Sequence, residues 1–397
     1  MSSDGRPEVV LPREALIAFA REAFELGETL DWKSHDPYDL LLTPFARTLF
    51  QRSSLLARLL LQAGRRSGSR VRQLLRVPVH EEPKVLADFL QAATLLSRLG
   101  EGWAARYANE LSVRLRERAA AGSTGLGWGL GFPSVTRFIS VAAGEPNIYT
   151  TTCACQALLD HHEATQDPAS LEAAFLGAQF IRTDLGSFTH HGRMWLRYAP
   201  ASTGAVINVQ ASAASLFARL GRREGSSMDL LEAADSAAET VISSQSSDGS
   251  WTYSADERGA FTDGFHTGFT LQGLQEYHSQ RRQRAASGTT RAIDAGFTYF
   301  KKHLLTPDGL PRGFADGRVS LDGQNLAQCI NTLLACGGDD GVRDAGRLWR
   351  LAAEQRGVQV SPFPALRWTI GPLVLATAAL ARVASEPDRL RALGDPH

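Results

Sequence analysis

The sequence predicts an all-α protein whose paired helices close into a ring, an α/α toroid or six-hairpin barrel with long rim loops at one end. Apolar residues recur every three to four positions along most of the 397-residue chain, as they do in helices. A similar helix start also returns at Leu171, Leu231, Ile293 and Arg343, at intervals of 60, 62 and 50 residues. This internal repeat predicts helical pairs that stack on one another.

Each repeated helix follows another helix that is richer in small residues. These first helices are predicted at 148–164, 207–221, 265–280 and 325–336. Segments 82–98 and 102–120 supply one more pair, and 369–385 with an N-terminal helix near 13–27 supplies a sixth. Because the first helices are apolar or small almost all round, they suit the inner wall of a closed ring. An open solenoid is the competing arrangement.

The connections between hairpins are longer than a structural link needs, which is typical of functional loops. They run over 122–147, 186–208, 247–263, 306–324 and 357–368. Each leaves an outer helix and enters an inner one, so in a ring they meet at one end and surround one mouth. We expect residues 1–80 to form an N-terminal helical extension and 81–397 to form the toroid domain.

The first rim loop carries glycine at every second position from Gly125 to Gly131. No GxGxxG and no GK[ST] can be drawn through it, so a nucleotide cradle is not supported. An extended segment of this kind would press Leu126, Trp128, Leu130 and Phe132 against the ring. Its glycine face would then leave room for a ligand, or would only permit tight packing of loop on loop.

Composition limits the function classes. Forty-two basic residues balance 42 acidic ones, so no global field recruits nucleic acid, and we expect no nucleic-acid partner. The four cysteines form no CxxC pair, which fits a reducing compartment. The N-terminus shows no charged start followed by an apolar signal core, and no window reaches eighteen apolar residues. We therefore expect a cytoplasmic location, with peripheral attachment at the inner membrane face as a further option.

Two segments resemble known toroid families. Gly249-Ser-Trp251 after Gln245 resembles the glutamine-tryptophan repeat of terpene cyclases, and 263–274 is similar to the zinc-histidine segment of protein prenyltransferase β subunits. Both families are α/α toroids. The chain has no DxDD, and it reads Asp322-Gly-Gln324 where the prenyltransferase pattern has a cysteine. We therefore expect no metal and no cofactor, since a zinc site requires three protein ligands.

A closer resemblance covers most of the chain. It is carried by Asp36-Pro-Tyr-Asp39, by 127–129 with Arg137, by 146–148 and by 265–268, together with the hairpin order. These features resemble a bacterial toroid family found with polysaccharide biosynthesis genes. That family is distantly similar to glucuronyl epimerases and six-hairpin glycosidases. Ile207 and Gln324 stand where the pattern leads us to look for histidines, which raises the question of an altered site.

The candidate catalytic residues are His266, Tyr149 and Asp263. His266 begins an inner helix three residues after Asp263, so both can face one mouth as an acid or base with its partner. The alternative is a helix start capped by Asp263. Arginines in the rim loops can hold a carboxylate, and aromatic rings can stack on sugars. The candidate substrate-binding residues are Trp128, Arg137, Arg197, Asn208, Trp251, Tyr253, Asp322, Gln324 and Trp368.

The stretch between Asp39 and Glu81 contains eight arginines and no acidic residue. The arginines surround a run of leucines, so residues 46–77 form a basic amphipathic segment. Its partner is an anionic membrane surface, an anionic glycan or an acidic protein. A structural helix whose arginines pair with acids elsewhere in the chain is the alternative.

Together these features favour a carbohydrate-active toroid, most simply an epimerase- or lyase-like enzyme on a uronate-containing or anionic glycan in polysaccharide biosynthesis. The expected chemistry is proton abstraction next to a carboxylate, with His266 and Tyr149 as the acid-base pair and Arg137 or Arg197 on the carboxylate. One alternative is a terpenoid cyclase- or prenyltransferase-like enzyme. The other is a non-catalytic scaffold that holds a glycan or a partner protein.

Overall fold

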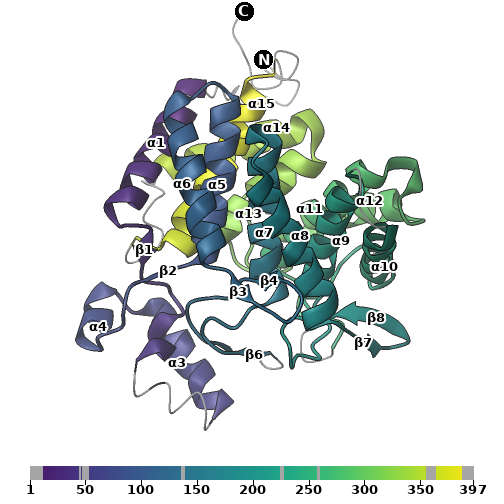
Figure 1. Ribbon diagram of the computed structural model, residues 1–397. Helices are drawn as coiled ribbons and strands as arrows, with labels where there is room; N and C mark the ends of the chain where they lie inside the picture. The colour runs from purple at the N-terminus through teal and green to yellow at the C-terminus, as the bar shows by residue number, and fades with distance from the viewer. Residues whose placement is uncertain are drawn as a thin grey trace, which may run out of the picture.

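A computed structural model describes residues 12–43, 46, 53–135, 139–223, 228–256, 260–354 and 364–386. Paired helices dominate it, as the periodicity predicts (Figure 1). The inner helices are α5 (Pro83–Arg98), α7 (Ile148–Thr165), α9 (Ile207–Gly221), α11 (Gly264–Arg281), α13 (Gly323–Cys336) and α15 (Gly371–Ala384). The outer helices are α6 (Gly102–Glu117), α8 (Pro168–Gln179), α10 (Met228–Ser243), α12 (Thr289–Tyr299), α14 (Gly338–Glu354) and α1 (Arg13–Thr29).

The inner helices form a closed ring. Each of them packs against the next along the chain, and α15 packs against α5, which brings the last inner helix back to the first. Each outer helix packs on its own inner partner, and α1 packs on α15. The predicted toroid is therefore confirmed over an open solenoid, and the N-terminal helix is the outer member of the sixth hairpin.

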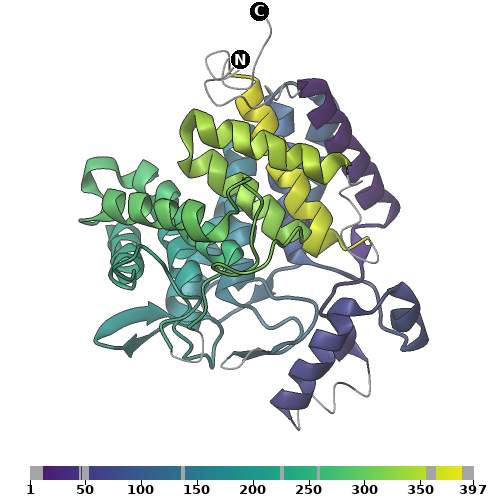
Figure 2. The same cartoon turned by 180° about the vertical axis from the view of Figure 1, so that it is seen from behind.

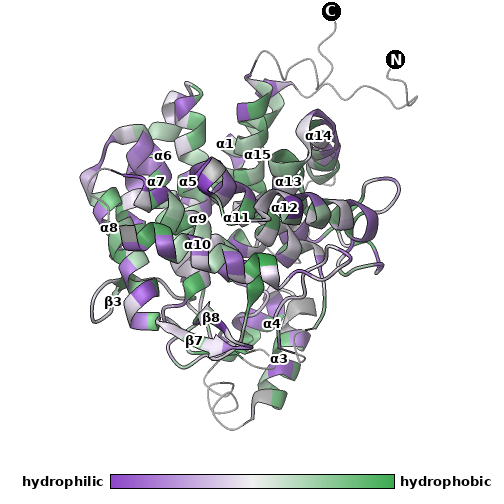
Figure 3. Cartoon of the chain, turned by 90° about the vertical axis from the view of Figure 1, so that its right-hand side faces the viewer, coloured by the Kyte–Doolittle hydropathy of each residue, from purple (hydrophilic) through white to green (hydrophobic). Residues whose placement is uncertain are grey.

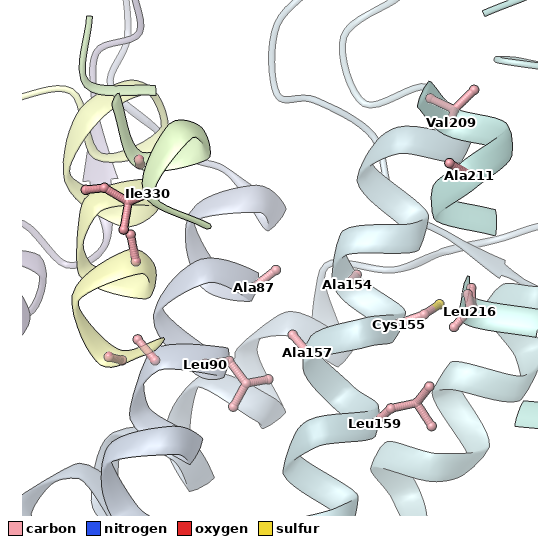
Figure 4. Packing of buried hydrophobic residues seen from close by; sticks show 14 of the residues in the cluster. Ala87, Leu90, Ala154, Cys155, Ala157, Leu159, Val209, Ala211, Leu216 and Ile330 are labelled. Carbon is pink, nitrogen blue, oxygen red and sulfur yellow. The ribbon is translucent and has the colours of Figure 1, made fainter. Parts of the chain in front are cut away.

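Small residues let the inner helices approach closely. Ala87 of α5 and Ala154 and Ala157 of α7 are fully buried at the junction of these two helices (Figure 4). Figure 3 shows hydrophilic residues on the outside of α12 and α14, whereas α15 is largely hydrophobic. Residues Leu366–Ala384, which include α15, are long and apolar enough to cross a membrane, but 78% of that window is buried in the protein. The apolar stretch is therefore an inner wall of the ring.

Helix starts follow the predicted capping chemistry. Asp167 precedes Pro168 and accepts a hydrogen bond from the backbone N–H of Ala169, which caps α8. Asn147 caps α7 through the N–H of Thr150 at 3.0 Å. The other predicted start signal, Ser226, lies outside the described residues.

Short antiparallel strand pairs organise the loops at one end of the ring. They are β1 (Lys33–Ser34) with β2 (His80–Glu81), β3 (Ala120–Ala121) with β4 (Leu126–Gly127), β5 (Ser134–Val135) with β6 (Ser140–Val141), and β7 (Ser187–His190) with β8 (Arg193–Leu196). The register pairs Lys33 with Glu81, Ala120 with Gly127, Ser134 with Val141 and Ser187 with Leu196. Figures 1 and 2 show these loops gathered at one end of the ring, opposite the last turns of α15.

Two helices project from the ring at the same end, α3 (Ser54–Arg66) and α4 (Ser69–Leu74), which we call the α3–α4 arm. They follow the short helix η1 (Asp39–Leu42). The division of the chain at residue 80 stays a prediction. Of the first eighty residues, α1 is part of the ring, whereas the arm stands beside it.

The tryptophans of the glycine-aromatic loops are core residues. Trp128 and Trp251 are buried and donate their indole N–H groups to the carbonyls of Leu115 and Val241, near the ends of α6 and α10. Gly296 of the next outer helix accommodates Trp251, because a Cβ there would lie 2.2 Å from the ring. Gly177 of α8 lies beside Trp128 in the same way, because a Cβ there would lie 2.1 Å from Cys155 Sγ and 3.3 Å from the Trp128 ring.

The glycine face of the first rim loop is packed. A Cβ at Gly125 would lie 2.2 Å from the carbonyl oxygen of Leu176, and one at Gly129 would lie 2.4 Å from that of Glu145. The neighbouring backbone therefore fills the space that a ligand would need. Of the two interpretations of this loop, tight packing is the one that the structure supports.

Candidate functional site

The inner helices all begin at the rim-loop end, and their second residues form one set. By the repeat these positions are equivalent, and α15 is preceded by a π-helical turn, η7 (Leu366–Ile370), that supplies the sixth. The residues are Lys84, Tyr149, Asn208, Phe265, Gln324 and Arg367. One turn deeper on the same helix faces lie Asp88, Cys153, Ser212, Phe269 and Gln328.

A contact across the ring indicates that these positions face its axis. The Tyr149 ring of α7 lies 6.1 Å from the Phe269 ring of α11, although α9 stands between the two helices in the ring. Deeper along the axis, Gln272 of α11 meets Gln328 of α13, and Gln156 of α7 meets Ser215 of α9. The inner wall is therefore lined with polar side chains. We call it the axial site.

His266 lies at the start of α11 and contacts Asp263 in two ways, one expected of a helix cap and one expected of an acid-base pair. Asp263 accepts from the His266 backbone N–H through Oδ1 and lies against the imidazole Nδ1 through Oδ2, both at 2.7 Å. A carboxylate at Nδ1 requires the proton on that nitrogen, which leaves Nε2 as the basic atom. Tyr253 packs against the imidazole with ring centres 4.3 Å apart and the two planes tilted by 50°. The same carboxylate therefore caps the helix and orients the histidine.

A buried lysine-carboxylate pair lies on the α5 side of the axis. The ammonium group of Lys84 contacts Asp88 one turn further along, and both side chains are almost fully buried. Burial raises the pKa of Asp88, although the Lys84 charge opposes that shift. Sequence reasoning missed this pair. Its signal was a lysine and an aspartate four residues apart within an otherwise apolar inner helix.

Arg367 is fixed at the mouth by three groups. Its guanidinium forms a two-pronged ion pair with Asp36 and lies 5.1 Å from the Phe132 ring and 5.2 Å from the Trp368 ring. Asp36 comes from the quoted Asp36-Pro-Tyr-Asp39 motif and was not predicted as a site residue. A carboxylate in an N-terminal turn gave no sign of which inner helix it would meet. Arg367, with Arg137 and Arg197, is one of the rim-loop arginines that the sequence offers as carboxylate binders.

Asp322 and Trp368 are joined directly. The Trp368 indole N–H donates to Asp322 Oδ2 at 2.6 Å, while Oδ1 of the same carboxylate caps α13 through the Gln324 N–H. Asp322 and His266 are therefore both engaged by protein groups. Within the described ranges, no three His, Cys, Asp or Glu side chains cluster as metal ligands.

Several buried polar atoms on the axial wall have no hydrogen-bond partner among the described residues. They are Tyr149 Oη, Asn208 Oδ1, Gln324 Oε1 and Asp88 Oδ2. Unsatisfied buried polar atoms are rare in folded proteins and point to a missing ligand or water. Burial also raises the pKa of Tyr149 well above its ordinary value, so its phenol is a hydrogen-bond donor at neutral pH.

The remaining predicted residues are distributed as follows. Tyr253 lies beside His266 and belongs with the axial site. Trp128 and Trp251 are enclosed in the core, and no ligand can stack on them as they are placed. Arg197 donates to the carbonyl of Ser202 and lies over the Phe188 ring. Arg137 lies outside the described residues.

Solved structures share this fold, and two of those described below are sugar-processing enzymes. No family model and no curated protein sequence matches the chain. An alpha-mannanase of glycoside hydrolase family 76 from Bacteroides thetaiotaomicron has a TM-score of 0.59 at 11% identity, over 75% of this chain and 85% of its own. Cellobiose 2-epimerase from Bacillus thermoamylovorans B4167 has a TM-score of 0.58 at 12% identity, over 78% and 90%. A protein from Listeria innocua has a TM-score of 0.58 at 13% identity, over 96% and 99%.

These similarities show the fold. The expected resemblance to six-hairpin glycosidases and sugar epimerases is confirmed at that level. Identities this low transfer no residue role, because one fold supports many chemistries. The function therefore has to be argued from the axial site.

Proposed function

We propose that this protein is a carbohydrate-active toroid enzyme that moves a proton on a sugar bound in the axial site. The partnerless polar atoms of Tyr149, Asn208, Gln324 and Asp88 carry the proposal. Tyr149 Oη can donate, whereas the free oxygens of Asn208, Gln324 and Asp88 accept. This set suits a ligand rich in hydroxyl groups, because each hydroxyl can both donate and accept. The sugar-processing proteins that share the fold give independent support.

His266 is the proposed base. Its Nε2 removes a proton from a carbon next to a carbonyl or carboxylate group, and the electron pair moves to that oxygen to give an enediolate. The Tyr149 phenol stabilises the developing charge by donating a hydrogen bond. Return of a proton to the opposite face inverts the carbon, which is epimerisation. Loss of a substituent from the neighbouring carbon gives the lyase outcome.

The proposal extends to the substrate and the pathway. The substrate is a uronate-containing or anionic glycan, and the protein acts in polysaccharide biosynthesis in the cytoplasm. Lys84 and Arg367 are cations on the wall, but each already faces a carboxylate, Asp88 and Asp36. Carboxylate recognition therefore depends on Arg137 or Arg197, the rim arginines that the sequence indicated. Acid-base chemistry of this kind requires no cofactor.

A binding scaffold is the second candidate, because Ile207 and Gln324 occupy the expected histidine positions and Ile207 is buried. A terpenoid or prenyl-processing enzyme is not retained. Its mouth would hold an acidic cluster, and in the part of the chain that the structure describes no three His, Cys, Asp or Glu side chains gather as a metal site.

The test is proton exchange in deuterated water. Purified protein is incubated with cellobiose, mannose and a glucuronate-containing disaccharide, and deuterium at carbon is followed by NMR. The proposal predicts label entering one of these sugars at a rate that falls in His266→Asn. Binding without exchange would support the scaffold, and exchange of cellobiose or mannose alone would remove the uronate specificity.

A further inference from the structure

The α3–α4 arm carries apolar side chains that nothing in the protein covers. One face of α3 packs on η1 through Ala57 and Leu61, which join Leu41 and Val135 in a small separate core. The opposite face is open. The exposed large apolar residues of the arm and its exit are Leu55, Leu56, Leu59, Val71, Leu74, Leu75 and Val79. Leu55 and Leu59 are 57% and 58% exposed, and Leu74 is 83% exposed.

This concentration is unusual within the described chain. Elsewhere in those ranges, exposed large apolar residues are fewer: Val113 and Met194 stand on separate elements, and Phe261, Phe314 and Val319 lie in the rim loops. Single exposed apolar residues are ordinary, but a concentration of them marks an interaction surface. Both helices of the arm expose apolar side chains within one short stretch of the chain.

The charge of the arm indicates what kind of partner it binds. No acidic residue occurs between Asp39 and Glu81, whereas Arg70 and Arg76 are exposed beside the apolar residues and Arg58 lies on the same helix as Leu55 and Leu59. A second copy of the chain would bring a second set of arginines against the first, which is unfavourable. An anionic surface that also accepts leucine side chains complements the arm.

We propose that the α3–α4 arm docks on an anionic lipid bilayer. The apolar helix Leu55–Gly64 is too short to span a membrane, which takes about 20 residues. A short helix with leucines on one side and arginines nearby lies in the interface, with its leucines among the acyl chains and its arginines on the lipid headgroups.

The arm is attached rigidly beside the mouth. Arg72 of α4 is fully buried and donates to Asp39 Oδ1 at 2.8 Å and to the carbonyl of Asp36 at 2.8 Å, while the side chain of Asp36 holds Arg367 in the axial site. One turn, 36–39, thus connects the arm to the site. Figures 1, 2 and 3 place the arm at the same end of the ring as the rim loops.

The position of the arm also indicates the substrate class, a step that rests on the proposed function. A protein docked through the arm would hold its mouth near the bilayer surface, where a glycan attached to a lipid carrier is presented. The substrate class would then be a lipid-linked glycan. The docking itself does not require the enzyme to be active.

Vesicle co-sedimentation of the full chain tests the docking. The lipid probes are phosphatidylcholine alone and phosphatidylcholine mixed with phosphatidylglycerol. We expect binding to the mixed vesicles only, weakening as salt is added. The charge variant Arg70→Glu with Arg76→Glu should bind roughly tenfold more weakly or worse, and the control Lys301→Glu with Lys302→Glu should bind as the wild type does.

The apolar contribution has its own pair of variants. Leu59→Ser with Leu74→Ser should lose binding, and the control Val113→Ser with Met194→Ser, also exposed, should keep it. His266→Asn should bind vesicles normally, which separates this proposal from the catalytic one. Equal binding of all variants, equal binding to neutral vesicles, or leucine-dependent dimers in sedimentation velocity would overturn the docking proposal.

Discussion

The guanidinium of Arg367 donates from Nε to Asp36 Oδ2 at 2.6 Å and from Nη2 to Asp36 Oδ1 at 2.9 Å, across 331 residues of sequence. This buried pair joins the N-terminal turn to the last inner helical segment. It places a fixed cation at the mouth, between the rings of Phe132 and Trp368. Two-pronged pairing of this kind fixes orientation as well as distance.

Removing one partner should therefore destabilise the protein strongly. Asp36→Asn leaves the Arg367 charge buried and unpaired, and we expect a loss of roughly 3–5 kcal/mol in the free energy of unfolding. Chemical denaturation measures it. Asp31→Asn is the control, because Asp31 is an exposed ion-pair partner of Lys33 and Arg114. Its cost should not exceed roughly 1 kcal/mol, and equal losses for the two variants would contradict the argument.

Asp263 has two separable roles. Asp263→Ala removes both the α11 cap and the group that orients His266, so it should cost roughly 1 kcal/mol of stability together with activity. Asp263→Asn keeps a capping oxygen and should retain stability, but it loses the charge beside Nδ1. Thermal unfolding and proton-exchange rates measured in parallel separate the roles. If both variants kept full exchange activity, His266 would not depend on Asp263.

His266 itself should be required for proton transfer. A positioned acid or base contributes on the order of 100- to 10,000-fold, so His266→Asn should lower the exchange rate by at least the smaller factor. The histidine ring is only half-buried and caps no helix, so the melting temperature should change little. A variant with unchanged exchange would assign the chemistry to another group.

The Tyr149 hydroxyl should contribute to ligand affinity and not to the stability of the fold. Since Oη has no partner in the described protein, Tyr149→Phe should leave the unfolding free energy unchanged or slightly raised. Sugar affinity should fall, by about tenfold for one lost hydrogen bond. Tyr107→Phe is the opposite control, because Tyr107 donates to Glu28 outside the axial site. It should affect stability and leave sugar binding intact, as calorimetry and denaturation can establish.

Acid should destabilise the protein in part through His161. Burial lowers the pKa of this imidazole below its ordinary value, so the unfolded chain binds its proton first as the pH falls. The contribution of His161 to stability is then complete above the unfolded pKa, near 6.5, and declines as the pH falls from there to the lowered folded pKa. His161→Gln should flatten the stability profile in this window. A profile identical to that of the wild type would contradict the assignment.

The sequence was sufficient for the architecture because the hairpin repeat is local. Each helix start, small-residue inner helix and long connection is encoded within about sixty residues, and the predicted closure by the N-terminal helix follows from the need to cover the last inner helix. Tyr149, Asn208, His266 and Gln324 could be proposed from the sequence because they stand at predicted inner-helix starts, where the structure also places them. Because the hairpins repeat around the toroid, the residues at these equivalent positions form one ring of side chains.

Other parts of the site depend on tertiary contacts that a repeat does not encode. Trp128 and Trp251 were predicted at the mouth, but an aromatic residue after a glycine has the same pattern whether it lines a loop or fills the space above a helix glycine. Lys84 and Asp88 were overlooked because their pairing is visible only once α5 is known to face the axis. Asp36 meets Arg367 only when the ring closes.

The claim that a sugar binds inside the ring is tested most directly by a crystal structure. The crystals are soaked at a saturating concentration of a sugar in which the protein exchanges deuterium. The account predicts electron density inside the ring, with sugar hydroxyls on Tyr149, Asn208 and Gln324 and a carbon within reach of His266 Nε2. Density confined to the outer surface, with the axial polar atoms bound only to water, would contradict it.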